Sequence, residues 1–92
     1  MATTTTSLLG LDDLYNKFIE EVNDTENYVK MSNEAKMTLG EYYYVGFWKI
    51  AEDEHTHAEF LYNLLKKKNY AITDDDEKHY HEVMSMFRKY TK

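Results

Sequence analysis

Residues 39–68 read LGEYYYVGFWKIAEDEHTHAEFLYNLLKKK. No proline interrupts this stretch, and its aromatic and apolar residues recur at the three- and four-residue intervals of an α-helix. Thr38 and Glu41 have the spacing of a capping box, in which each side chain satisfies a backbone donor at a helix start. The lysines at 66–68 suit the negative end of the helix dipole. We therefore predict one long helix over this stretch.

The flanking sequence predicts two more helices. The whole chain has no proline and three glycines, so little in it would interrupt a helix. A first helix is expected from Leu8 or Leu11 to Ala35, after a disordered or extended segment over residues 1–7. A third is expected over residues 74–90, where a threonine cap and four consecutive acids suit a helix N-terminus.

These helices predict an all-α fold. Residues 8–92 would form one domain: a long antiparallel two-helix hairpin followed by a short C-terminal helix. A chain of 92 residues buries only about two-thirds of the surface exposed when it is unfolded. Self-association is therefore expected, and two hairpins together would complete a four-helix bundle. The C-terminal helix carries an apolar stripe of Tyr80, Val83, Met84 and Phe87.

Composition and charge exclude several classes of function. The net charge of -6 and the pI of about 5.1 argue against nucleic acid and anionic membranes as partners, because both attract excess Lys and Arg. The absence of cysteine excludes disulfides and thiolate metal sites, which leaves oxygen and imidazole as metal ligands. No apolar run approaches the roughly 20 residues of a membrane span. We expect a cytoplasmic protein without a membrane segment.

Polar residues interrupt the aromatic face of the long helix. A helical wheel places Glu52, His55 and Glu59 on the same face as Trp48. A carboxylate facing a core costs several kcal/mol unless it is paired, protonated or bound to metal. Glu52 and His55 are three residues apart, so both side chains can reach one point. This pair is a candidate for metal binding.

The first helix adds a third candidate ligand. Glu21 falls within its apolar stripe, whereas Glu20 lies on another face. One such carboxylate and a Glu-x-x-His pair form half the ligand set of a di-metal carboxylate bundle, and a twofold axis would supply the other half. Carboxylate and imidazole ligands suit iron or manganese. Nearby aromatic residues would support the ligands and exclude water, namely Tyr28, Tyr44, Trp48 and Tyr62.

The spacing of these residues resembles that of the encapsulated ferritins and, more distantly, the rubrerythrin branch of the ferritin-like superfamily. The resemblance rests on Ile19-Glu20-Glu21-Val22 with Tyr28, followed by Ala51-Glu52-Asp53-Glu54-His55. Tyr28 lies seven residues after Glu21, and Glu52 thirty-one, close to the family's spacing. The similar region spans roughly Leu14 to Asn69, and a short third helix after it also fits the family's layout.

The resemblance implies a ferroxidase that oxidises Fe(II) with oxygen at a site built across a dimer, with two irons at each dimer interface. By this resemblance, Glu21, Glu52 and His55 would be the metal ligands and catalytic residues. Tyr28 would lie beside the site. Glu20 matches one of the family's acids that admit metal, but Asn23 stands where another acid is expected. An encapsulin shell is an implied partner and its nanocompartment an implied location, although residues 88–92 lack a Gly-Ser-Leu-like targeting tail.

Other readings of the same residues stay open. A buried Glu–His pair that sets helix register would need no metal, and the chain would then be a helical oligomerisation or protein-interaction module. A manganese or mixed-metal centre that handles peroxide would use the same ligands as a ferroxidase. Glu59 could be an extra ligand or help to admit metal. The remaining histidines are interpreted as surface residues, namely His57, His79 and His81.

Overall fold

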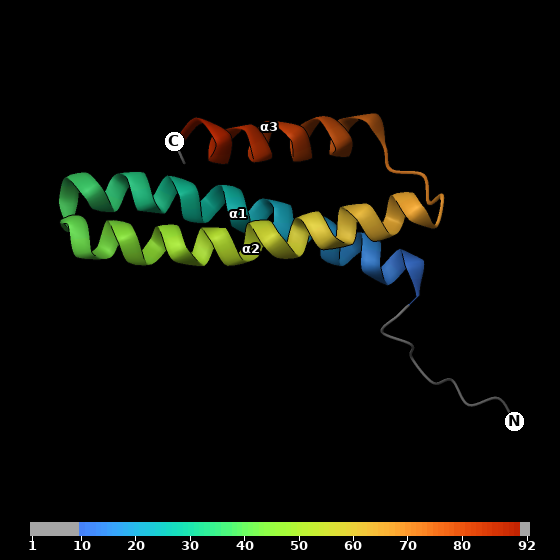
Figure 1. Cartoon of the computed structure of the whole chain (residues 1–92), viewed down its shortest axis with the longest axis horizontal. Helices are drawn as coiled ribbons and strands as arrows, with labels where there is room; N and C mark the ends of the chain where they lie inside the picture. Colours follow the sequence, from blue (N-terminus) through green and yellow to red (C-terminus); the bar gives the residue numbers. More distant parts are fainter. Residues whose placement is uncertain (1–9, 91–92) are drawn as a thin grey trace, which may run out of the picture.

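The computed structural model describes residues 10–90, and this part of the chain is all-helical, as predicted. The helices are α1 (Leu11–Thr38), α2 (Glu41–Lys67) and α3 (Asp74–Tyr90). The first two are long and run antiparallel side by side, and the third is shorter (Figure 1). The prediction for residues 1–7 lies outside the described residues.

Glycine makes the turn between α1 and α2. The backbone N–H groups of Leu39 and Gly40 both donate to the carbonyl oxygen of Ala35, each at 2.8 Å, which closes the end of α1. Gly40 then adopts a φ of 103°, which side-chain-bearing residues rarely reach. This residue lets the chain reverse over two positions and starts α2 antiparallel to α1.

The predicted capping box at Thr38 is wrong. α1 continues past Ala35 to Thr38, whose hydroxyl donates to the Glu34 carbonyl oxygen at 2.9 Å within the helix. No side chain caps the start of α2, although Glu41 lies in its first turn. A threonine inside a helix can satisfy its hydroxyl on the preceding turn. The turn at Gly40 therefore forms without a capping hydrogen bond from the Thr38 side chain.

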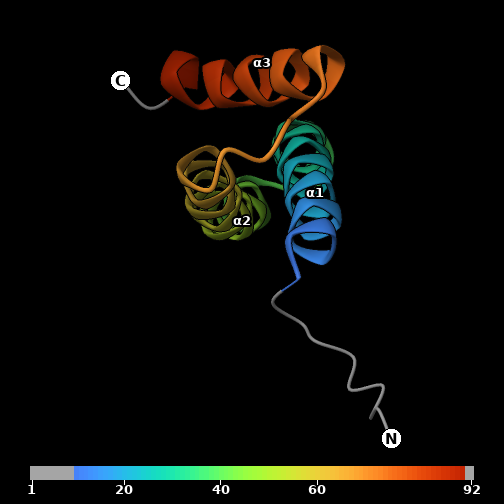
Figure 2. The same cartoon turned by 90° about the vertical axis from the view of Figure 1, so that its right-hand side faces the viewer.

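The start of α3 agrees with the prediction. The Thr73 hydroxyl accepts a hydrogen bond from the Asp76 backbone N–H at 3.1 Å, as an N-cap does. Seen along the hairpin in Figure 2, α3 crosses over one side of the α1–α2 pair and runs obliquely to both helices. The predicted apolar stripe faces the hairpin and is buried, namely Tyr80, Val83, Met84 and Phe87.

The core lies where α3 covers the hairpin. Phe18 of α1 is fully buried, and its ring centroid lies 6.0 Å from that of Tyr62 and 5.5 Å from that of Tyr80. Towards the hairpin turn, Phe87 packs against Trp48 with ring centroids 4.8 Å apart. On the opposite side of the hairpin, no helix among residues 10–90 covers α1 and α2.

A polar contact also joins α3 to α1. His79 Nε2 lies 2.8 Å from Glu26 Oε1, and both side chains are half-buried. The hydrogen bond from His79 holds the pKa of Glu26 below its usual range, against the opposing effect of burial. His79, predicted to be a surface residue, therefore helps to hold α3 in place.

Removing this contact should destabilise the fold in a pH-dependent way. A carboxylate whose pKa is lowered by folding stabilises the native state above its unfolded pKa of about 4.5, and that stability is lost as pH falls through the folded pKa. We expect His79→Ala to lower the free energy of unfolding by about 1 kcal/mol at pH 7. The difference should shrink in thermal melts near pH 3, about 1.5 units below the unfolded value.

The matched control for this experiment is His81→Ala. His81 also lies on α3, but its Nε2 is 3.5 Å from Glu77 Oε2 on the same helix. Its ring meets that of Tyr62 on α2 with centroids 5.7 Å apart, so its contact with a second helix is between rings rather than an ion pair. Its removal should change stability by less than about 0.5 kcal/mol. An equal loss in both variants would contradict the role given to His79.

None of the described helices combines the length and apolar character needed to cross a membrane.

Candidate metal centre

A buried carboxylate lies near the middle of the hairpin. Glu21 is only 6% exposed, and it projects from α1 towards α2. Its Oε1 atom is buried without a hydrogen-bond partner. Burying such an oxygen unsatisfied costs on the order of 1–3 kcal/mol, so a cation or donor at this position would stabilise it.

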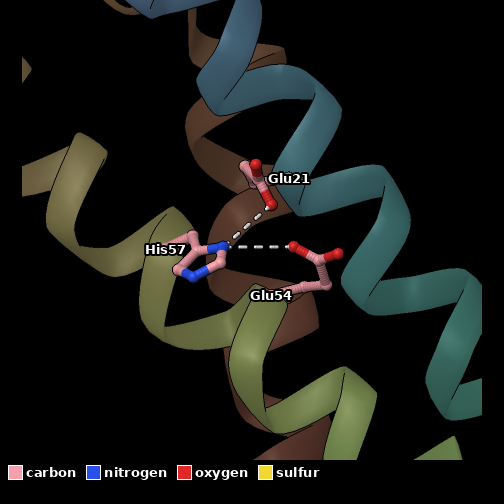
Figure 3. A group of neighbouring side chains, drawn as sticks. All are labelled: Glu21, Glu54 and His57. Atoms are coloured by element: carbon pink, nitrogen blue, oxygen red, sulfur yellow. Dashed lines mark ion pairs between the residues drawn. The ribbon is translucent and has the colours of Figure 1, made fainter.

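Two side chains of α2 meet Glu21. His57 Nδ1 lies 3.5 Å from Glu21 Oε1 and 3.3 Å from Glu54 Oε1, and Figure 3 shows the three side chains converging. Glu54 and His57 are three residues apart, so both project from one side of the helix. One potential ligand atom from each residue lies within 4.8 Å of the others. These are the described residues that come together as a metal-ligand group.

The pKa values of the two carboxyl groups are shifted in opposite directions. The hydrogen bond to Glu21, together with burial and repulsion, raises the pKa of Glu54 to about 7. Burial alone would raise the pKa of Glu21, but the hydrogen bond to Glu54 and the charges of Lys17 and His57 outweigh it and lower the pKa. The pair therefore binds a shared proton more readily than two isolated carboxylates would. A metal ion would replace that proton.

Lys17 supplies an ammonium group at the edge of the cluster. Its Nζ atom lies 3.5 Å from Glu21 Oε2 and 3.1 Å from Glu20 Oε1. The side chain is more than half exposed, so it can move into solvent without disturbing the core. Glu20, predicted to help admit metal, is thus an exposed partner of Lys17.

The predicted pair Glu52 and His55 does not lie beside Glu21. With Glu59, both line a separate groove of about 670 Å³ between α2 and α3. The His55 ring packs against Phe87 with centroids 4.6 Å apart. The reason is that α3, rather than α1, covers this side of α2.

The predicted supporting residues also divide between the two sides of the hairpin. Tyr28 lies on α1, as Glu21 does, and its ring packs on that of Phe47 of α2 with centroids 6.4 Å apart. Trp48 packs on α3 instead. The Tyr62 hydroxyl donates to Glu77 Oε2 at 2.6 Å, which raises the pKa of Tyr62 to about 12.

Sequence reasoning passed over Glu54 and His57. The Glu54-x-x-His57 pair has the same spacing as Glu52-x-x-His55, so spacing alone cannot separate them. His57 was interpreted as a surface residue, and its side chain is indeed 58% exposed even though it contacts Glu21. A usable signal was present: Glu54 fits the three-and-four spacing of the residues buried along α2, namely Ala51, Ala58, Leu61 and Leu65.

The cluster offers two carboxylates and one imidazole, the ligand types preferred by iron, manganese and zinc. Three protein ligands would leave positions on a metal ion for a bridging group, water or substrate. Comparison with known proteins finds no matching family model, curated protein or solved structure. The likeness to ferritin-like proteins therefore rests on residues and spacing alone.

Proposed function

We propose that this chain binds a divalent metal ion through Glu21, Glu54 and His57, and that it is a ferroxidase with Fe(II) as substrate. The observation that carries the proposal is the buried Oε1 of Glu21, which has no hydrogen-bond partner and lies beside a second carboxylate and an imidazole. Glu54 and His57 replace Glu52 and His55 as the α2 ligands. Each Fe(II) held there would give up one electron, and oxygen would accept the electrons.

The face that carries the cluster supports a site shared by two copies. The hollow beside Glu21 is lined by residues of α1 and α2, and in Figure 3 the ribbon of α3 passes behind the hairpin. Phe60 and Leu61 of α2 line this hollow together with Lys17 and Glu21 of α1.

A second hairpin packed on this face would cover the apolar side chain of Phe60, which lines the hollow beside Glu21 and is 68% exposed in one chain. A twofold axis near Glu21 would bring two Glu–Glu–His sets together, which is the ligand complement of a di-iron bundle. We therefore include a homodimer in the proposed function. Residence in an encapsulin shell stays a prediction.

Anaerobic loading with Fe(II) tests the proposal. The protein would be separated by size and its iron measured by elemental analysis. We expect about one iron per chain in a dimer or a multiple of it, and oxygen consumption with Fe(III) absorbance when air is admitted. Retention of no metal would contradict the proposal. Manganese loading followed by peroxide consumption, without Fe(II) oxidation, would favour the peroxide-handling alternative.

A metal-free interaction module is the second candidate. It is favoured by Lys17, whose ammonium group already gives Glu21 a cation at 3.5 Å, and by the exposed apolar side chains of the hairpin. This candidate predicts the same melting temperature with chelator and with added metal. A metal that binds only the native state stabilises it by about 2.7 kcal/mol at a hundred times its Kd, which a thermal melt resolves.

A further inference from the structure

One glycine lies in the interior of α2, at a position where no contact among residues 10–90 requires glycine. Gly46 occupies a helical position, where glycine is less stabilising than any other residue except proline. A Cβ atom added there would meet nothing within 4 Å, so no packing within the described chain requires glycine. Gly40, by contrast, is needed for its positive φ. Gly46 allows close approach by something outside the described chain.

The surroundings of Gly46 are apolar and exposed. A groove of about 620 Å³ runs along this part of α2, with Tyr42, Val45 and Lys49 among its lining residues. Tyr42 is 81% exposed, and its ring meets that of Tyr43 on the same helix with centroids 5.0 Å apart. Tyr42 and Lys49 lie about half a turn around α2 from the buried Ala51 and Ala58, and so face away from α1.

We propose that this patch, formed by Glu41, Tyr42, Val45, Gly46 and Lys49, packs against the same patch of a second copy, with the two α2 helices crossing antiparallel at Gly46. The charges favour a second copy as the occupant. The whole chain carries a net charge of -6 and repels its own copies, but the two charged residues between positions 39 and 50 are Glu41 and Lys49, which balance.

The order of the charges selects the antiparallel orientation. Glu41 and Lys49 lie on either side of Gly46 along the helix. Under a twofold axis at Val45 and Gly46, residues before the axis meet residues after it, so Lys49 of each copy lies against Glu41 and Tyr42 of the other. A parallel pairing would place like charges together. Tyrosine is also a residue type enriched at protein interfaces.

None of the patch residues belongs to the Glu21, Glu54 and His57 cluster, so the contact needs no metal ligand. The patch lies on the same side of α2 as His57, because the eleven positions from Gly46 to His57 make about three turns. It lies about 16.5 Å away along the helix, so a dimer with its axis at Gly46 and a dimer with its axis near Glu21 are alternative pairings of one face.

Sedimentation of the full chain across a concentration series tests the proposal. Gly46→Leu should require at least about tenfold more protein for the same association, because the added side chain holds the two helices apart. It should not unfold the chain, since its Cβ meets nothing and leucine favours helix. Asn63→Leu is the matched control: it places leucine on an exposed polar position of α2 outside the patch, and association should be unchanged.

A charge exchange tests the orientation. Lys49→Glu and Glu41→Lys should each weaken association at least about tenfold, because each puts like charges together. An equimolar mixture of the two variants should associate like the wild type, since opposite charges then face each other across the contact. Wild-type association in Gly46→Leu, or no recovery in the mixture, would overturn the proposal. Iron content per chain, measured alongside, reports on the metal site separately and should be unchanged in Gly46→Leu.

Discussion

The His57→Ala protein is expected to bind Fe(II) at least about 100-fold more weakly than the wild type, since even residues that only support metal ligands contribute 10- to 100-fold. His57 supplies the nitrogen in the cluster. Its Nδ1 atom lies 3.5 Å from Glu21 Oε1 and 3.3 Å from Glu54 Oε1. Without it, two carboxylates of like charge would have to hold the metal alone. Titration with Fe(II) under anaerobic conditions, followed by elemental analysis, measures the loss.

His55→Ala is the matched control, because it removes the same residue type two positions earlier on the same helix. His55 lines the groove under α3 rather than the hollow beside Glu21, so iron binding should stay within about threefold of the wild type. The reverse result, in which His55→Ala loses iron and His57→Ala retains it, would return the ligand role to Glu52 and His55. Glu54→Gln should behave like His57→Ala.

Phe18→Ala is expected to lower the free energy of unfolding by about 3–5 kcal/mol, out of the 5–15 kcal/mol typical of such domains. Phe18 is fully buried, and its ring touches α2 through Tyr62 and α3 through Tyr80. Its loss would leave a cavity where all three helices meet. In thermal denaturation each kcal/mol should lower the Tm by roughly 4–8 °C.

Met37→Ala provides the comparison for this change. Met37 is also a large apolar side chain on α1, but it is 85% exposed, so its removal should change stability by less than about 0.5 kcal/mol. A small effect of Phe18→Ala, comparable to that of Met37→Ala, would contradict the packing of α3 on the hairpin. Circular dichroism at 222 nm would follow both transitions.

Local signals in the sequence account for most of the helix boundaries. The Thr73 hydroxyl and the acids after it placed the start of α3 correctly, because capping depends on neighbouring residues. The Thr38 signal failed for a related reason: the same hydroxyl can bond within a helix or cap the next one. The turn itself depends on Gly40, because glycine can adopt the positive φ that the turn requires.

By itself, the sequence determined three helices, the buried stripe of α3 and the presence of Glu21 on an apolar face. Helical periodicity and caps depend on residues within a few positions of each other. Only the tertiary structure decided which Glu-x-x-His pair meets Glu21. Two pairs offset by two residues point to different sides of α2, and the side that faces α1 depends on how α1 and α3 pack around that helix. Packing placed Glu54 and His57 beside Glu21, and turned Glu52 and His55 towards α3.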